Sequence, residues 1–286
     1  MSHIEKRSAR RWRARYRGPD GRERSQTFTR RADAERFLVS VEHSKATGQY
    51  VDPSQGRVTL GAWAGEWLES VRPTLKEGTF ASYEGLLRSR VLPMFGNRPL
   101  AALRPSDVQT WIGAMQDGGL SPSRTRQAVV VLRQVLDAAI RDGMVGRNAT
   151  HGVKLPKIEQ REAAYFEPEI VEQIANQLPE SYGLLIRLLG TLGLRWGEAA
   201  ALKRRHVDLL RRRLLVEESL AEVGGRLVTG QTKSHAVRSV PLSPSLAAAL
   251  EAHLEHHTAD AYVFTSPEGA PLSPDPPNSD LKSIAS

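Results

Sequence analysis

The feature that most constrains the fold is a stretch of roughly 90 residues, from Thr59 to Asn148, in which apolar side chains recur at helical spacing. A proline or glycine cluster ends each run of this pattern, so the stretch divides into four amphipathic segments that predict a four-helix bundle. The expected core positions are Leu60, Trp63, Trp67 and Leu68 in the first segment, Phe80, Tyr83, Leu86, Leu87 and Val91 in the second, Val108, Trp111, Ile112 and Met115 in the third, and Ala128, Val131, Leu132, Val135, Leu136 and Ile140 in the fourth. We interpret the aromatic side chains among them as core residues rather than as ligand sites.

Capping signals mark the ends of two of these helices. The pair Ser106-Asp107 predicts the start of the third helix, whereas Ser121 predicts the start of the fourth helix and Gly143 its end.

Three arginines in the fourth helix, Arg124, Arg126 and Arg133, are candidates for contacts with phosphates of a nucleic acid. A solvated helix face explains them equally well at this point.

The amino-terminal residues follow a different pattern. The segment from Trp12 to Arg17 alternates strictly between apolar and basic side chains, turn residues follow, and Arg22 to Phe28 predicts a returning strand. The apolar face of the first strand has Trp12, Ala14 and Tyr16, and its basic face has Arg13, Arg15 and Arg17. A helix capped by Thr29 and running to about Thr47 is expected to cover the apolar face. The basic face then stays open.

Charge is concentrated in the same segment. The chain has a net charge of +8, and residues 1–36 contain twelve Lys or Arg against five Asp or Glu. A basic sheet of this kind can enter the major groove of double-stranded DNA, which makes Arg13, Arg15 and Arg17 candidate DNA-binding residues. RNA, a membrane surface and a merely solvated basic tail remain alternatives.

Composition excludes several classes of chemistry. The chain has no cysteine, which excludes disulfides, thiolate zinc sites and cysteine nucleophiles. We expect no metal site and no cofactor. The sequence has no apolar run long enough for a membrane span and begins with no secretory signal, so we expect a cytoplasmic protein.

After a polar linker, the pattern predicts a second large module. A helix with Ile170, Ile174 and Leu178 precedes an apolar helix from Tyr182 to Gly190. Gly193 is expected to end the apolar helix and Arg195 to begin another, in which Arg195 and Glu198 share a face because they lie three residues apart. An arginine at the end of a buried helix must be paired or must face a cleft. A structural ion pair between Arg195 and Glu198 is therefore one interpretation.

Three short strands follow in the sequence. Leu214 to Glu217, Leu227 to Thr232 and Val237 to Leu242 predict a three-stranded sheet with Lys233 at a hairpin tip. An exposed lysine at a turn usually has no specific role.

Several of these strings resemble the tyrosine recombinase family, and in particular its phage integrases. The string Thr191-Leu-Gly-Leu-Arg195-Trp-Gly-Glu198, with Asp208 after it, resembles the first catalytic arginine motif of that family. Thr232-Lys233-Ser234, followed by the string from Arg238 to Leu242, is similar to its lysine hairpin. The basic sheet with its helix resembles an arm-type DNA-binding domain, and the bundle resembles a core-binding domain, through the string from Phe95 to Leu100 among others.

The resemblance implies a fold and a division into domains. The expected fold is mainly α with small β-sheets: a basic amino-terminal β-sheet plus helix in 1–56, a four-helix core-binding bundle in 57–150, a linker in 151–164 and a partial α+β catalytic domain in 165–286.

The resemblance also implies a reaction. In the family a tyrosine attacks a DNA phosphodiester, which gives a 3′-phosphotyrosine and a free 5′ hydroxyl. By resemblance, Arg195 would stabilise charge on the phosphoryl oxygens, Lys233 would donate a proton to the leaving 5′ oxygen, and Glu198 would support Arg195. The reaction needs no metal or nucleotide cofactor. The implied partners are double-stranded DNA at attachment sites and further copies of the chain assembled on it.

The resemblance stops before two further motifs of the family. We find no helical His-x-x-Arg motif, because His235-Ala-Val-Arg238 lies within the predicted lysine hairpin, and we find no tyrosine nucleophile near the carboxy terminus. Tyr262, the only tyrosine after Lys233, lies in a strand-like string and is expected to pack in the core. We therefore expect a sequence truncated before these motifs, with Asp275 to Ser286 outside the family.

The histidines His253, His256 and His257 close an Ala- and Leu-rich helix, where polar or cationic groups suit the carboxyl end. A metal cluster is the alternative for them.

Three functions compete on these grounds. The first is a phage or prophage integrase that performs site-specific recombination, although this chain lacks a visible nucleophile and is not established as an enzyme. The second is a non-catalytic DNA-binding protein that occupies attachment sites or regulates an intact integrase. The third, an unrelated helical regulator of transcription, leaves Arg195 and Lys233 unexplained.

Overall fold

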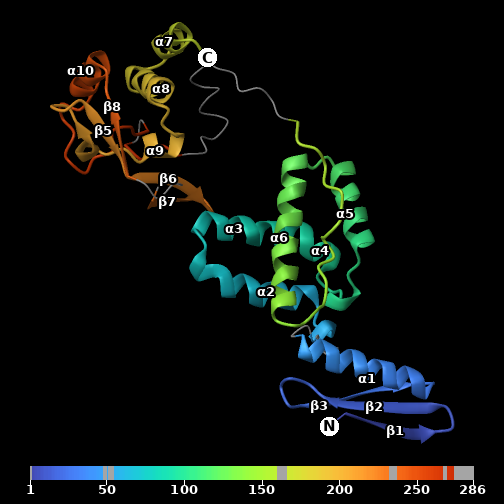
Figure 1. The fold of residues 1–286 in the computed structure, drawn as a ribbon. Coiled ribbons are helices and arrows are strands. Elements are labelled where there is room, and N and C mark those ends of the chain that lie inside the picture. The colour runs from blue at the N-terminus through green and yellow to red at the C-terminus, as the bar shows by residue number, and fades with distance from the viewer. Residues whose placement is uncertain are drawn as a thin grey trace. The chain divides into compact units, whose positions relative to one another are not determined.

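The computed structural model describes residues 2–47, 50, 55–159, 166–231, 237–266 and 269–273. The chain divides into two compact units, 1–160 and 161–286. The order of elements is that of a small sheet with one helix, a helical bundle and a mixed α/β module (Figure 1). The expected fold class, mainly helical with small antiparallel sheets, is confirmed. No helix among the described residues is long and apolar enough to cross a membrane.

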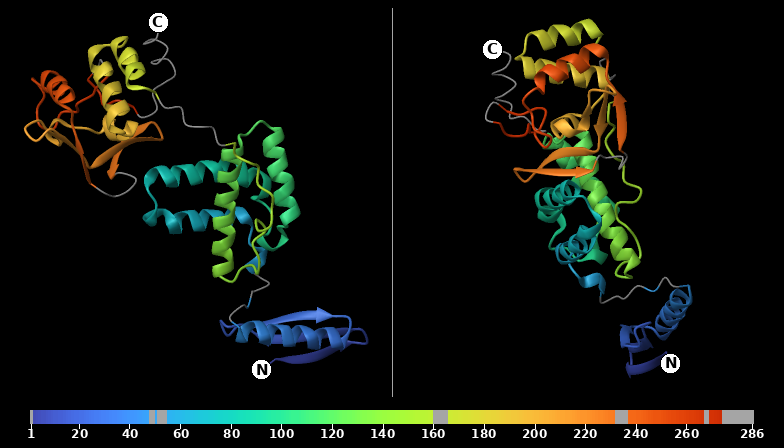
Figure 2. Two further views of the ribbon diagram at one scale, coloured as in Figure 1. Left: turned by 45° about the horizontal axis from the view of Figure 1, so that its top comes forward. Right: turned by 90° about the vertical axis from the view of Figure 1, so that its left-hand side faces the viewer.

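The amino-terminal module is a three-stranded antiparallel sheet with one helix against it. The strands are β1 (His3–Ser8), β2 (Arg11–Arg17) and β3 (Glu23–Phe28), in that spatial order, and α1 (Arg31–Ala46) lies along one face (Figures 1 and 2). Ala14 and Tyr16 are buried against α1, and the Tyr16 ring packs edge-on against Phe37 at 5.6 Å between ring centroids. The predicted apolar face of β2 is therefore confirmed.

Two details of this module differ from the prediction. Strand β1 was not predicted, because Ile4 is its only large apolar residue and a bulge between Lys6 and Ser8 interrupts its pairing. Helix α1 begins one residue later than expected, with Arg30 rather than Thr29 as its N-cap residue and without a side-chain cap.

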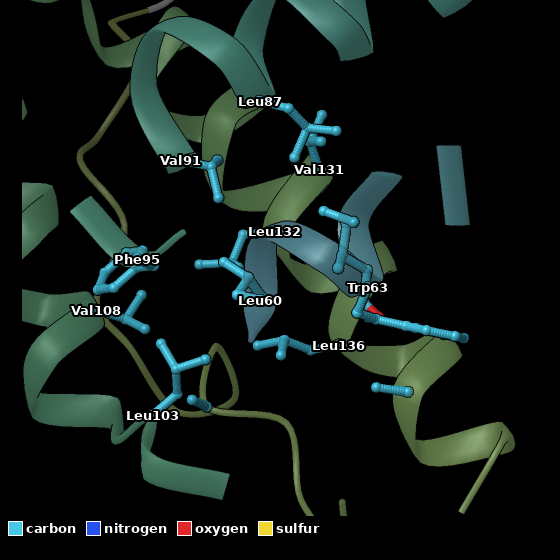
Figure 3. Close-up of a cluster of buried hydrophobic side chains, with 14 of the residues drawn as sticks. Leu60, Trp63, Leu87, Val91, Phe95, Leu103, Val108, Val131, Leu132 and Leu136 are labelled. Atoms are coloured by element: carbon cyan, nitrogen blue, oxygen red, sulfur yellow. The ribbon is translucent and has the colours of Figure 1, made fainter. Parts of the chain in front are cut away.

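The middle module contains the four predicted helices around one apolar core. These are α2 (Leu60–Val71), α3 (Glu77–Leu86), α5 (Pro105–Asp117) and α6 (Pro122–Arg141). Helices α2 and α3 run side by side and cross α6 steeply, whereas α5 runs beside α6 (Figures 1 and 2). All four helices contribute side chains to one core. Figure 3 shows the part of this core around Leu60, Leu132 and Leu136.

The second helix of this module does not end where α3 ends. It continues through a π-helical turn, Leu87–Val91, into α4 (Leu92–Phe95), and this continuation brings Val91 and Phe95 fully into the core (Figure 3). The widened turn changes the helical register, so a single period of 3.6 residues does not describe the whole segment.

The capping predictions are partly corrected. Ser121 caps α6 as expected, with its hydroxyl accepting a hydrogen bond from the Arg124 N–H. Helix α5 begins at Pro105 instead of after Ser106-Asp107, because the Asp107 carboxylate reaches back to the Arg104 N–H at 3.0 Å from the third position of the helix.

The chain stays in contact with the bundle after its last helix. Val153 and Leu155 pack against the core, and the side chain of Gln109 on α5 accepts a hydrogen bond from the Lys154 N–H and donates one to its carbonyl. Arg126 on α6 donates to the Pro156 carbonyl at 2.7 Å. The first residues of the predicted linker are thus held by the bundle.

The carboxy-terminal unit has helices α7 (Pro168–Asn176), α8 (Glu180–Leu192), α9 (Trp196–Ala200) and α10 (Pro244–His253). In α7 the buried residues are Val171 and Ala175, so the expectation that Ile170 and Ile174 face the core is wrong. Gly190 of α8 leaves space for the Val171 side chain, and the same helix presents Gly183 to the Ala175 carbonyl. Close approach of the two helices at these glycines selects the face of α7 that is buried.

The strands of this unit form two small sheets rather than the predicted single sheet. Strand β5 (Arg213–Val216) pairs with β4 (Val207–Asp208) and with β8 (Arg238–Pro241), whereas β6 (Glu218–Val223) forms a hairpin with β7 (Arg226–Gln231). Gly224 and Gly225, both at positive φ, make a two-residue turn that returns the chain directly onto β6. The predicted strand at 227–232 therefore pairs with an unpredicted neighbour.

Candidate functional site

The site is built around Arg195, at the junction of α8 and α9. Gly193 ends α8 in the left-handed region with φ of +62°, as predicted, and this turns the chain sharply before the next helix. Arg195 is the N-cap residue of α9. Its side chain is 59% exposed, although it follows an apolar helix.

Glu198 ties Arg195 to the start of α9. Its carboxylate accepts a hydrogen bond from the Arg195 N–H at 2.9 Å. It also forms an ion pair with Arg195, whose Nη1 lies 2.9 Å from Glu198 Oε1. The Glu198 side chain is only 1% exposed. The predicted pairing of these two residues is thus present, with a buried acid and an exposed arginine.

A second arginine, which the sequence analysis did not assign to the site, contacts the same carboxylate. Arg238 donates from Nη1 to Glu198 Oε1 at 3.0 Å and from Nη2 to Oε2 at 2.6 Å. It lies at the start of β8, opposite Val216 of β5. The resemblance includes Arg238 in the string that follows the lysine hairpin, and it gives this arginine no role at the site. The sequence signal that Arg238 carries is its place in an alternating strand directly after the predicted lysine turn.

Glycine at position 197 brings α9 close to strand β6. A Cβ atom at Gly197 would lie 2.7 Å from Ser219 Oγ and even closer to the Leu220 carbonyl oxygen. Only glycine allows this approach, which fixes the position of α9 and with it Arg195 and Glu198.

Paired hydrogen bonds keep the Glu198 carboxylate charged. The bonds from Arg238 lower the pKa of Glu198 to about 2, with further lowering from the main chain and side chain of Arg195, while burial acts in the opposite direction. The same pair raises the pKa of Arg238. A buried negative charge between two arginines is therefore stable at neutral pH.

We expect this carboxylate to make the carboxy-terminal unit acid-labile. The pKa of Glu198 in the folded protein is about 2, below its ordinary value of 4.5. The ionised carboxylate therefore contributes its full share to the free energy of unfolding above pH 4.5, and this share is lost as the pH falls towards about 2. A shift of this size corresponds to about 3 kcal/mol of stability. Urea unfolding, followed by the ¹⁹F NMR signal of fluorotryptophan at Trp196, would measure it, since Trp196 is the only tryptophan of this unit. Equal midpoints at pH 5 and pH 3 would contradict the expectation.

Lys233, the second predicted catalytic residue, lies outside the described residues, which resume at Val237 after Gln231. Its neighbours along the chain are the end of β7 and the start of β8.

The predicted DNA-binding arginines of the amino-terminal module lie on β2. The register and alternation of β2 place Arg13, Arg15 and Arg17 on the face away from Ala14 and Tyr16. Arg15 is partly neutralised, because it pairs with Glu23 at 2.7 Å and with Glu5 at 3.3 Å.

The three candidate arginines of the bundle differ in their surroundings. Arg133 is partly buried, and its guanidinium donates to the side chain and the carbonyl of Thr150. Arg124 is exposed, and among the described residues its guanidinium bonds only the side chain of Gln127. Arg126 is half-buried and its Nε holds the Pro156 carbonyl, so it has a structural contact as well as any role at a surface.

The expectation that Tyr262 packs in the core agrees with the structure. Tyr262 packs against the apolar core of the carboxy-terminal unit, with Lys203 Nζ over its ring at 5.5 Å. Of the three histidines expected to close the helix before it, only His253 lies in α10, and His256 and His257 follow its end. The His253 ring bonds the Val263 carbonyl and stacks on Phe264. No group of acidic or histidine side chains among the described residues is arranged to hold a metal ion.

Comparison with known proteins gives matches along most of the chain. Residues 3–47 match the family model "Phage integrase, N-terminal domain", residues 59–116 match "Phage integrase, N-terminal SAM-like domain", and residues 165–286 match "Phage integrase family". The third match includes 275–286, which we had expected to lie outside the family.

Individual proteins agree with these matches. The integrase of Mycobacterium phage L5 is 26% identical over 263 residues, which cover 87% of this chain and 70% of that protein. A structure of the Tn1549 transposon integrase in complex with transposon right end DNA aligns with a TM-score of 0.66 at 18% identity, over 76% of this chain and 74% of that one. A lambda integrase tetramer bound to a Holliday junction aligns with a TM-score of 0.63 at 18% identity, over 99% of this chain and 82% of that one. The chain belongs to the tyrosine recombinase family, within its phage integrases.

Proposed function

We propose that this chain binds double-stranded DNA at attachment sites as a site-specific recombinase of the phage integrase type. The observation that carries the proposal is Arg195, an exposed guanidinium held at a helix start by a buried, fully ionised Glu198. A fixed cation with free donors is suited to bind a phosphodiester and to stabilise charge that develops on its oxygens.

The reaction of the family is DNA strand cleavage and rejoining, in which a tyrosine hydroxyl attacks the scissile phosphate and displaces the 5′ oxygen. In that reaction Arg195 would contact the scissile phosphate and Lys233 would protonate the leaving 5′ oxygen, and the bond energy is conserved in the phosphotyrosine. The 286 residues contain no tyrosine after Tyr262, which packs in the core. We therefore propose that these 286 residues by themselves bind DNA without cleaving it.

Self-association on DNA is part of the proposal. One similar structure is a lambda integrase tetramer bound to a Holliday junction, and another is a lambda integrase dimer bound to a core site. We expect this chain to assemble in the same way on paired sites.

The test uses a pool of randomised DNA duplexes and the full chain. Sequences retained by the protein are selected, and the selected duplex is then used with and without a nick. We expect a salt-sensitive mobility shift and no denaturant-resistant adduct on the nicked duplex. An adduct would overturn the non-catalytic part of the proposal and make Tyr262 the first residue to replace. No shift would overturn the proposal as a whole.

Matched variants test whether the sheet of the amino-terminal module contacts DNA. We expect R13Q/R17Q to weaken binding about tenfold or more and to reduce the salt slope by about 2, since two phosphate contacts are lost. The control R30Q/R36Q removes the same charge from the start and the exposed surface of α1. Equal losses in the two variants would show that net charge, and not the open face of the sheet, determines binding.

A further inference from the structure

We propose that Arg238 is a positioning residue, which occupies Glu198 and thereby keeps the guanidinium of Arg195 free to bind a phosphate. This inference rests on the proposed function of Arg195.

Glu198 is saturated by donors in the structure. Its two oxygens accept four hydrogen bonds: the N–H and Nη1 of Arg195, and Nη1 and Nη2 of Arg238. An ionised carboxylate has about four acceptor sites, so no site remains for a further donor. The fork of two parallel bonds is made with Arg238 rather than with Arg195.

As a consequence, only some of the hydrogen-bond donors of Arg195 are used by Glu198. One side-chain donor, Nη1, is fixed on Glu198, and within the described residues no protein acceptor bonds its Nε or Nη2. Its side chain is 59% exposed, against 34% for Arg238. The guanidinium of Arg195 is thus anchored at one nitrogen, and its other nitrogens meet no acceptor in the described part of the chain, as a phosphate-binding group requires.

Removal of Arg238 would change which donors of Arg195 bond Glu198. Two acceptor positions on Glu198 would become vacant in a buried place, where an unsatisfied charge is costly. Arg195 is the neighbouring cation, and it can fill them by turning a second nitrogen towards Glu198. The paired form competes directly with phosphate for the same donors.

The alternative is that the ion pair only fastens β8 to α9. Both roles predict some loss of stability without Arg238, so stability does not separate them. They differ in the effect on Arg195. If Arg238 only joins β8 to α9, its removal would make the Arg195 side chain more mobile. If Arg238 competes with Arg195 for Glu198, its removal would immobilise the Arg195 side chain on Glu198.

The first measurement needs no DNA. In full-length protein with ¹⁵N-labelled arginine, we expect the Nε–H order parameter of Arg195 to rise in R238Q relative to the native protein and to rise less in R238K, which keeps the charge but not the fork. The control is R187Q, which breaks another ion pair of the same unit, Arg187 with Glu172 at 2.8 Å. An unchanged or lower order parameter in R238Q would overturn the proposal.

The second measurement is affinity for a nicked duplex. We expect R238Q to bind about tenfold more weakly, R187Q to bind within about twofold of the native protein, and R195Q/R238Q to bind no more weakly than R195Q. E198Q/R238Q should regain affinity relative to R238Q, because the anion that captures Arg195 is gone. Additive losses, or a further loss in E198Q/R238Q, would overturn the proposal. If the native protein binds no DNA, the proposed function fails, while the NMR measurement still decides the role of Arg238.

Discussion

Replacement of Glu198 by glutamine is expected to lower the free energy of unfolding of the carboxy-terminal unit by about 3 kcal/mol. Glutamine keeps the shape but not the charge, so Arg195 and Arg238 would face each other without a counterion. Removal of one partner of a buried ion pair typically costs about 3–5 kcal/mol, and we expect the lower end because both arginines reach solvent.

Urea unfolding followed at fluorotryptophan 196 measures this loss without interference from the other modules, whose tryptophans all precede residue 160. The matched control is E172Q. Glu172 pairs with Arg187 at 2.8 Å but is 51% exposed, and an exposed pair of this kind contributes about 0.2–1 kcal/mol. If E198Q costs no more than E172Q, burial does not give the Glu198 pair its strength.

Local patterns were sufficient to predict much of the fold. The alternation from Trp12 to Arg17 predicted both faces of β2, since successive side chains of a strand point to opposite sides. The positions of the four long helices of the bundle also followed from periodicity, because each buries one apolar stripe in a common core. In these segments the local preference and the tertiary packing agree.

Errors occurred where partners distant in sequence decide the structure. The face of α7 is selected by Gly183 and Gly190 of the next helix, which no pattern within α7 reveals. The pairing of β5 with β8 passes over an intervening hairpin, so strand propensity predicted strands but not their neighbours.

The candidate site shows the same division. Arg195 and Glu198 are three residues apart, and their pairing was predicted from that spacing alone. Arg238 reaches Glu198 from 40 residues away, through the register of β8 with β5, and only the folded structure brings it there. The contact between Arg238 and Glu198 could therefore not be predicted from the sequence.

Replacement of Gly197 by alanine is expected to have the second large effect. Its Cβ would collide with the Leu220 carbonyl and with Ser219 Oγ, and backbone atoms of a hairpin cannot move away as a flexible side chain can. We expect a loss of about 2–3 kcal/mol in the carboxy-terminal unit, because overpacking outweighs the better helix propensity of alanine. The displaced α9 would also move Arg195, so affinity for a nicked duplex should fall as far as it does in R195Q.

The control is G230A, in a strand of the same unit, where a Cβ would meet nothing within 4 Å. We expect its unfolding midpoint and its affinity to stay close to those of the native protein. If G197A behaves like G230A, contact between α9 and β6 does not fix the position of Arg195, and the ion pairs of Glu198 must hold it alone. A loss of affinity in G197A without a loss of stability would instead show that the hairpin adapts to the methyl group while the site does not.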